Sequence, residues 1–287
     1  MQSKNIETRD SGNVGVQGLL LLRRPAAWLL VAIIALNPLV ISCSDDDNEV
    51  DYPVFGDGVT DVDGNVYQTI IIGGQEWMAE NLIVSSFRDG TDIPSGFTAE
   101  EWSQLETAAY AVHDHQDVDG IDLPQEMVAA YGVLYNWHAA AEEKGLCPEG
   151  WRIPSDADWQ QFLDYLEQEQ GIVNQDEADG AGNALKAARQ DGHPWGGDHD
   201  TAEHPYWLAH EKHHGTDDFA FHVLPAGGRG DDGLYKNLLE GAGFWTSTEA
   251  SADKAWHYYS IHLAGNVSRD DFDKRFGLSV RCIRKDD

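Results

Sequence analysis

The clearest strand pattern in the hydrophobic and polar positions of the chain begins at residue 66. Residues 66–72 are β-branched or aromatic except Gln68, Gly73-Gly74 follows, and residues 75–78 include Trp77 and Met78. β-Branched and aromatic residues favour strands and paired glycines favour tight turns, so these residues predict a hairpin. In the last third of the chain, similar runs predict four more strands, over residues 219–224, 244–247, 256–263 and 278–284.

Helical periodicity is clearest after Ser155. Apolar side chains recur there at helical spacing, at Trp159, Phe162, Leu163 and Leu166. Ser155 and Asp158 have the spacing of a capping box, so a helix is predicted to begin at this point. Weaker patterns predict helices over residues 98–105, 131–143 and 181–189, with loops over residues 111–126 and 191–218.

The order of these elements predicts an α+β fold. Helices come before most strands, which favours short helices packed on a mostly antiparallel sheet, with long loops. Residues 61–287 contain no internal repeat and no composition typical of a linker, so they are expected to form a single domain.

The N-terminal segment has the form of an export signal. Arg23 and Arg24 precede an apolar run over residues 26–40, which is shorter than the roughly 20 residues of a membrane span. The run ends at Cys43 in a sequence that resembles the lipobox of bacterial lipoproteins. Residues 1–42 are therefore predicted to be a lipoprotein signal peptide, with Cys43 acylated and contact with the membrane made through the lipid anchor alone. The alternative is an uncleaved N-terminal anchor.

Residues 43–60 are predicted to be a tether that begins at the acylated cysteine. Residues 44–49 are polar and acidic and cannot pack into a core. They resemble the acidic signal that sends lipoproteins of Bacteroidetes-type bacteria to the outer face of the outer membrane. Exposure at the cell surface is therefore expected, and a periplasm-facing lipoprotein is the alternative.

The net charge of −31 limits the choice of partners. Asp and Glu number 50 against 19 Lys and Arg, and no basic tract is present. Such a chain repels a phosphate backbone, so nucleic acid is excluded as a partner. The charge is typical of a soluble surface protein. The alternative, which assigns the charge a specific function, is cation binding.

The predicted export also affects whether the cysteines are oxidised to a disulfide. Once Cys43 is acylated, Cys147 and Cys282 remain in an oxidising compartment. A disulfide between them is predicted, and it would close a long loop worth about 5 kcal/mol on the chain-entropy model. Two separate buried thiols are the alternative.

Six stretches together resemble a known family. They are DGNVYQTIIIGGQEWMAENL, YGVLYNWHAA, GLCPEGWRIPSDADW, LPAGGRG, FWTSTEASADKAW and GLSVRC, in this order over most of residues 60–287. The chain resembles the Fibrobacter succinogenes major paralogous domain family of exported bacterial proteins. The resemblance implies a C-type-lectin-like fold, related to the formylglycine-generating sulfatase-modifying proteins, with the ends of the domain close together and long loops on one face. It implies no established activity.

Two groups of acidic residues are weak candidates for calcium. Asp61, Asp63 and Asn65 alternate near Gly64, and a second group surrounds Gly120; it consists of Asp117, Asp119 and Asp122. Oxygen ligands two residues apart suit calcium, but neither run completes the twelve-residue loop, and turn-forming side chains are the commoner explanation. No cofactor is therefore expected, with calcium as the weak exception.

A histidine-rich stretch is a weak candidate for zinc or copper. Its spacing matches no standard motif, so a solvated loop is the alternative. The stretch contains His193, His199, His204, His210, His213 and His214.

The candidate ligand-binding residues lie in the last third. The Glu-Pro-Asn, Gln-Pro-Asp and Trp-Asn-Asp runs of calcium-dependent lectins are missing, so sugar binding would be non-classical. Arg229, Asp231, Asp232 and Tyr235 lie in a glycine-rich loop and are expected on an exposed face. Trp256 is a candidate for aromatic stacking, with burial in the core as its alternative.

The motifs of common enzyme classes are not found. The sulfatase-modifying relatives need a redox-active cysteine pair, whereas the two cysteines here are expected in a structural bridge. The sequence thus predicts a surface-exposed lipoprotein, not an enzyme, that binds an extracellular glycan or protein. One alternative is a structural or assembly component of the envelope or an adhesin; the third is a metal-dependent enzyme.

Overall fold

The computed structural model describes residues 52–191 and 200–285. These residues belong to one compact unit that runs from Glu49 to Asp287. The predicted signal peptide, Cys43 and residues 44–51 of the tether lie outside the described residues. Within the described ranges, no helix is both long and apolar enough to span a membrane.

The larger sheet has eight strands, in the order β14-β13-β12-β10-β15-β6-β5, with β11 paired to β10 alone. Neighbouring strands are antiparallel except β10 and β12, which are parallel. The mostly antiparallel α+β architecture is thus confirmed. The strands are β5 (Tyr110–Ala111), β6 (Leu134–Asn136), β10 (Ala226–Arg229), β11 (Tyr235–Leu238), β12 (Gly241–Glu249), β13 (Lys254–Ile261), β14 (Ser268–Asp273) and β15 (Gly277–Leu278).

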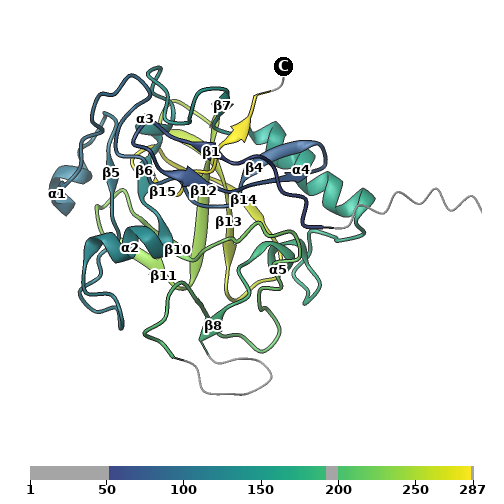
Figure 1. Ribbon diagram of the computed structural model, residues 1–287. Helices are drawn as coiled ribbons and strands as arrows, with labels where there is room; N and C mark the ends of the chain where they lie inside the picture. The colour runs from purple at the N-terminus through teal and green to yellow at the C-terminus, as the bar shows by residue number, and fades with distance from the viewer. Residues whose placement is uncertain (1–51, 192–199, 286–287) are drawn as a thin grey trace, which may run out of the picture. The chain divides into compact units, whose positions relative to one another are not determined.

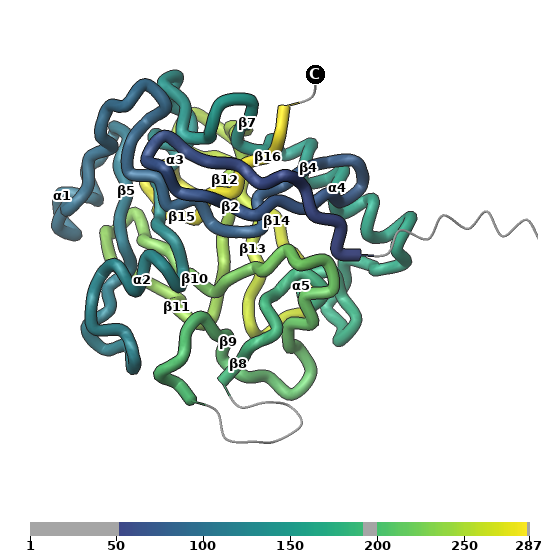
Figure 2. The backbone as a smooth tube through the Cα atoms, viewed as in Figure 1, coloured from purple at the N-terminus to yellow at the C-terminus, as the bar shows by residue number. Residues whose placement is uncertain are grey.

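A second sheet joins the two ends of the domain. Its order is β3-β4-β16-β7, so the C-terminal strand lies between β4 and β7 (Figures 1 and 2). The predicted hairpin is confirmed as β3 and β4, whose turn contains Gly73 and Gly74 with φ of 59° and 76°. The strands are β3 (Thr69–Ile72), β4 (Gln75–Met78), β7 (Trp151–Arg152) and β16 (Ile283–Arg284); two small two-stranded sheets comprise β1 (Val59–Thr60) with β2 (Val66–Tyr67) and β8 (Gln190–Asp191) with β9 (Trp207–Leu208).

The longest helix is α4 (Asp156–Glu169), and it begins where the capping box predicts. The Ser155 hydroxyl accepts a hydrogen bond from the Asp158 amide (3.2 Å), and the Asp158 carboxylate accepts one from the Ser155 amide (2.6 Å). Its apolar stripe is buried against β3, β4, β12 and β13. The other described helices are short: α1 (Ala99–Trp102), α2 (Pro124–Tyr131), α3 (Trp137–Ala140) and α5 (Ala181–Leu185).

Aromatic side chains fill the core beneath α4. The Trp159 ring lies 5.0 Å from that of Trp77 and stacks on Tyr258 at 5.0 Å, measured between ring centroids. Phe162 and Phe221 complete this cluster. Each fully buried side chain of this size contributes a few kcal/mol, so α4 is held mainly by burial of its apolar stripe.

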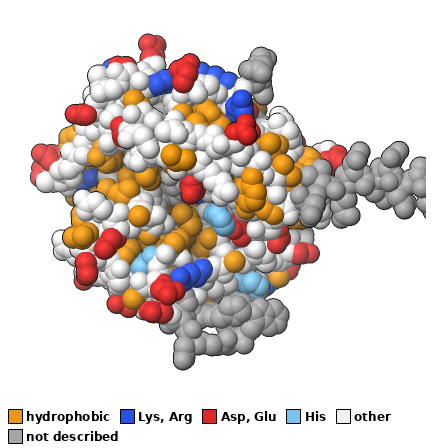
Figure 3. Space-filling view, in the orientation of Figure 1, with side chains coloured by type: hydrophobic (Ala, Val, Ile, Leu, Met, Phe, Trp, Pro, Cys, Tyr) orange, Lys and Arg blue, Asp and Glu red, His pale blue; other side chains and the backbone are white. Residues whose placement is uncertain are grey.

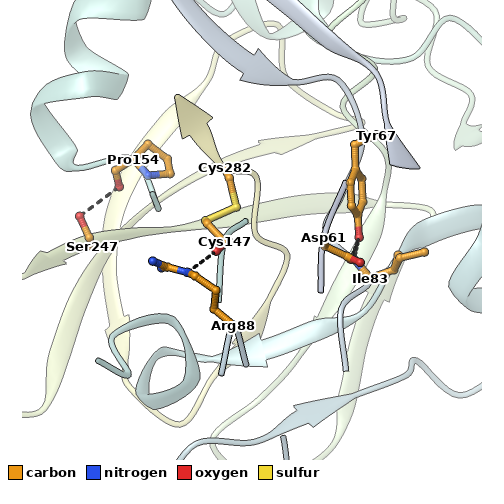
Figure 4. Close-up of a disulfide and its surroundings, with 8 residues drawn as sticks. All are labelled: Asp61, Tyr67, Ile83, Arg88, Cys147, Pro154, Ser247 and Cys282. Atoms are coloured by element: carbon orange, nitrogen blue, oxygen red, sulfur yellow. Dashed lines mark hydrogen bonds between the residues drawn. A yellow bond between two sulfur atoms is a disulfide. The ribbon is translucent and has the colours of Figure 1, made fainter. Parts of the chain in front are cut away.

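The predicted disulfide is present. Cys147 and Cys282 are bonded across a sequence separation of 135 residues and are almost fully buried (Figure 4). The carbonyl of Cys147 also accepts a hydrogen bond from Arg88 Nε at 3.1 Å. The bridge therefore fastens the segment before β7 to the segment that leads into β16.

The predicted helix over residues 131–143 is wrong. Gly132, with φ of 84°, ends α2, and residues 134–136 form strand β6. The Asn136 side chain then accepts a hydrogen bond from the Ala139 amide and begins the short helix α3. The apolar spacing of this stretch therefore comes from a strand and a helix that are both buried. The predicted helix over 181–189 is likewise shorter, because α5 ends at Leu185.

The predicted strand over residues 219–224 is also wrong. Ala220 and His222 have φ of 53° and 47°, a left-handed conformation that no strand adopts. The carbonyls of Phe221 and His222 instead accept hydrogen bonds from Arg281. The strand predicted over 278–284 is divided into β15 and β16 around that arginine.

The boundary predicted at residue 60 is wrong as well. The Tyr52 hydroxyl hydrogen-bonds that of Tyr165 on α4 (2.7 Å), and Phe55 bridges to Ile70 of β3. Residues 52–60 thus pack on the domain and do not belong to a solvated tether.

Removing the disulfide should destabilise the domain. We expect the Cys147→Ala, Cys282→Ala double variant to lose about 3–5 kcal/mol of unfolding free energy, because the unfolded chain regains the entropy of a long loop. Urea denaturation followed by tryptophan fluorescence measures this loss. An unchanged midpoint would show that the bridge adds nothing to stability.

Candidate functional site

The first candidate calcium run is a turn. Asp61 Oδ1 accepts hydrogen bonds from the amides of Asp63 (3.0 Å) and Asn65 (2.9 Å). Its Oδ2 accepts one from the Tyr67 hydroxyl at 2.6 Å (Figure 4). The carboxylate of Asp63 accepts from the amide and hydroxyl of Ser85. These carboxylate oxygens already accept hydrogen bonds from the chain. The run is therefore explained by turn-forming side chains, which was the alternative to a calcium site.

The second acidic run connects two loops. Asp119 Oδ2 accepts a hydrogen bond from Thr201 (2.7 Å), and the Asp119 carbonyl lies 2.6 Å from His204 Nε2. His204 Nδ1 lies 2.7 Å from the Tyr131 hydroxyl. Across residues 52–191 and 200–285, no three His, Cys, Asp or Glu side chains, Asp117 and Asp122 included, are placed to share a metal ion. His193 and His199 lie outside the described residues.

The candidate Trp256 and its neighbour Trp245 on the adjacent strand have different environments. Trp245 is fully buried in the core. Trp256 is half-buried, and the Arg269 guanidinium covers its ring at 3.3 Å from the centroid. Arg269 in turn forms a bidentate ion pair with Asp156 at the start of α4. The exposed part of Trp256 is thus already engaged by a cation.

The glycine-rich loop proves to be the β10–β11 hairpin. Arg229 is only 3% exposed, so its predicted place on an exposed face is wrong. The rings of Trp102 and Tyr235 enclose its guanidinium. Asp232 is exposed, but its carboxylate holds the turn, since it accepts from the Leu234 amide and pairs with Lys236 at 2.8 Å. Asp231 is half-buried beside it.

One hollow is visible on the face shown in Figure 3, where hydrophobic side chains gather between α2 and the β1–β2 hairpin. It measures about 530 Å³, and Val66, Val128 and His222 are among its lining residues. The His222 imidazole pairs with the Asp217 carboxylate. The imidazole of this hollow already has a partner, so it is not free to bind a ligand.

The better candidate is a groove of about 380 Å³ on the larger sheet, which we call the sheet groove. Its floor is strand β12, where Gly241 and Gly243 lie opposite Ile261 and Tyr259 of β13. Because strand side chains alternate between faces, β13 projects His257, Tyr259 and Ile261 toward this side. Gly241 leaves the space above β12 open between those side chains and the β10–β11 hairpin, whereas the Leu278 side chain packs on Gly243.

Aromatic and polar groups share the walls of the sheet groove. Phe272 of β14 and Phe276 pack against each other at 4.4 Å between ring centroids along one wall. Polar groups come from Lys236 and Asn237 of β11 and from Asp270 of β14. Mostly apolar walls with a few convergent polar groups are typical of small-molecule sites.

His257 is the unusual residue of this groove. It is fully buried, and neither ring nitrogen has a hydrogen-bond partner among the described residues. The Phe272 ring covers it at 3.9 Å between centroids. Burial lowers the pKa of His257 to about 4, against the opposing effect of Asp270 and Asp271. The imidazole is therefore neutral at physiological pH.

Sequence reasoning missed the sheet groove. The alternation of His257, Tyr259 and Ile261 with buried neighbours was visible, and so was the pair of glycines at 241 and 243. These two signals combine only when the register between β12 and β13 is known. Of the predicted ligand-binding residues, none lines the sheet groove.

Fold and groove together define a disulfide-bonded α+β domain with a cavity on its larger sheet. The model of the Fibrobacter succinogenes major domain matches residues 70–284. The chain therefore belongs to this family, and the resemblance of its six motifs is confirmed. Searches of curated proteins and of solved structures found no match.

The buried imidazole gives a pH test of the groove. Between pH 6.5 and about 4 the unfolded chain binds a proton on His257 and the folded protein does not, so the unfolding free energy falls as pH drops. In the His257→Phe variant this fall should be smaller, by roughly 3 kcal/mol or less. Urea denaturation at a series of pH values measures the difference. Equal pH profiles for both proteins would show that His257 is not held neutral.

Proposed function

We propose that the protein is a cell-surface lipoprotein whose domain binds an extracellular glycan in the sheet groove. The observation that carries this proposal is the groove itself, with its glycine floor and aromatic walls. The apolar face of a sugar ring stacks on aromatic side chains such as Tyr259 and Phe272, while its hydroxyls need a few polar partners. Asn237 and Asp270 supply such partners at the edges of the groove.

The N-terminal sequence supports the proposed location. We propose that residues 1–42 are removed, that Cys43 carries the lipid, and that the acidic residues after it direct the protein to the outer face of the outer membrane. The acidic surface and the disulfide suit an extracellular environment. The lipid is then the only contact with the membrane, and the groove binds its ligand without catalysing a reaction.

A C-type-lectin-like fold is part of the same proposal. Strand β16 pairs with β4, so the two ends of the domain lie together, as that fold implies. The bridge between Cys147 and Cys282 fastens this closure. In this reading the sheet groove takes the place of the calcium site of classical lectins, so binding requires no cation.

Gly241→Val tests the site. A Cβ at this position would have no atom nearer than 3.7 Å, so valine fits the strand while its methyl groups fill the groove. We expect binding to weaken at least about tenfold, or 1.4 kcal/mol. Ser247→Val is the matched control, since Ser247 is an exposed residue of the same strand that does not line the groove. Its affinity should stay within about twofold of the wild type.

The measurement uses the acyl-free protein, residues 44–287. A glycan array, run with calcium and again with chelator, identifies the ligand, and calorimetry then compares the two variants. The expected result is one glycan class bound equally in both conditions. Failure to bind any glycan would overturn the proposal in favour of a protein partner. Equal affinity of Gly241→Val and the wild type would overturn the assignment of the groove.

A further inference from the structure

A separate hollow of about 560 Å³ lies where the β10–β11 hairpin meets the acidic loop before α2. We call it the Arg229 hollow. Strand β11 contributes to both cavities, because Lys236 and Asn237 line the sheet groove whereas Tyr235 and Leu238 line this hollow. The acidic loop adds His113, Asp114, Asp117 and Val118 to its lining. The hollow thus brings together residues from two distant parts of the sequence.

Arg229 carries a buried charge without a counter-ion. Its Nε donates to the Gly233 carbonyl (2.9 Å) and its Nη2 to the Phe97 carbonyl (2.7 Å), which uses two of five N–H donors. No carboxylate of the described residues forms an ion pair with this guanidinium. Burial lowers the pKa of Arg229, which reflects the cost of keeping the charge there. A carboxylate from a ligand would offset that cost with charge-assisted hydrogen bonds.

The Tyr235 ring contacts two other side chains of this hollow. The Arg229 guanidinium lies 4.9 Å from its ring centroid, and the His113 ring lies at the same distance. The Tyr235 hydroxyl has no hydrogen-bond partner among residues 52–191 and 200–285. Burial lowers the pKa of His113, so this ring is neutral at pH 7 and adds no second cation. A single anionic group therefore matches the hollow.

The other polar groups of the hollow are carboxylates, which favour a ligand with hydroxyl groups. Asp114 and Asp117 are exposed carboxylates that line the same hollow. Carboxylates accept hydrogen bonds from hydroxyl groups but repel further anions. An acidic peptide brings several carboxylates close together and lacks ring hydroxyls. A sugar acid has one carboxylate per ring surrounded by hydroxyls.

We propose that the Arg229 hollow binds a uronic acid residue of an acidic polysaccharide. The sugar carboxylate accepts hydrogen bonds from the Arg229 guanidinium and the Tyr235 hydroxyl, and the ring hydroxyls donate to Asp114 and Asp117. The apolar edge of the ring lies against Leu234 and Leu238. This site is distinct from the sheet groove and does not depend on the function proposed for that groove.

The test compares trigalacturonate with its methyl ester, which has the same rings and hydroxyls but no charge. Calorimetry is run on residues 44–287 in the presence of chelator, so that no cation bridges the ligand to acidic side chains. We expect the acid to bind at least about tenfold more tightly than the ester. Tyr235→Phe keeps the ring contacts with Arg229 and His113 and removes the hydroxyl, and it should weaken binding of the acid about tenfold with little change in thermal unfolding.

Two control variants separate this site from its neighbour. Lys236→Met removes an adjacent cation that lines the sheet groove, and Gly241→Val fills that groove; both should leave trigalacturonate affinity within about twofold of the wild type. Loss of binding in either variant would overturn the assignment to the Arg229 hollow. Equal affinity for acid and ester, no binding of trigalacturonate, or an unchanged Tyr235→Phe would overturn the proposal. Tighter binding of tetraglutamate would point to an acidic peptide instead.

Discussion

The hydrogen bonds of the buried Arg281 guanidinium are the interaction on which the rest of the domain depends. It is 1% exposed, and its Nε donates to the Asn81 side chain at 3.0 Å. Its other nitrogens donate to the carbonyls of Phe221 and His222, and rings of the core cover its faces. Burial lowers its pKa to about 9. A buried cation that lost any of these acceptors would cost several kcal/mol, so the segments that supply them are fixed relative to one another. The first and last motifs of the family, residues 63–82 and 277–282, meet at this residue.

How much of this structure the sequence predicts depends on how local each signal is. Helix α4 and the β3–β4 hairpin follow from caps, glycines and periodicity within a dozen residues, and both form as predicted. Strand β14 has the sequence Ser-Arg-Asp-Asp-Phe-Asp, with no apolar alternation, and becomes a strand only because β13 offers it a partner. The stretch from Leu134 to Ala140 shows the opposite failure. Its apolar residues have helical spacing, but they are buried in a strand and a helix, and periodicity alone does not distinguish these cases.

The candidate sites show the same limit. Because Arg229 lies in a glycine-rich stretch, the sequence predicts that it is exposed. In the structure Trp102, from a distant part of the chain, covers one face of its guanidinium. The sheet groove depends on two glycines that become opposite neighbours of Tyr259 and Ile261 only through strand register. The disulfide pairing was predictable for a different reason, because the predicted export and acylation of Cys43 would leave only two cysteines to pair. The number of cysteines was enough to predict that pairing. The positions of side chains on the surface could be known only from the three-dimensional structure.

The place of β16 between β4 and β7 bears on how the chain acquires its structure. An internal strand of a sheet cannot be omitted while its neighbours pair, and this one follows Arg281 and Cys282 by one or two residues. The second sheet, the hydrogen bonds of Arg281 and the disulfide therefore cannot form until the final residues of the domain are available. A chain that emerges from its N-terminus first has no closed core until residue 284 has emerged. The topology thus prevents the core from closing before nearly all of the domain's sequence is available, and the last strand completes the second sheet and brings Cys282 to its partner.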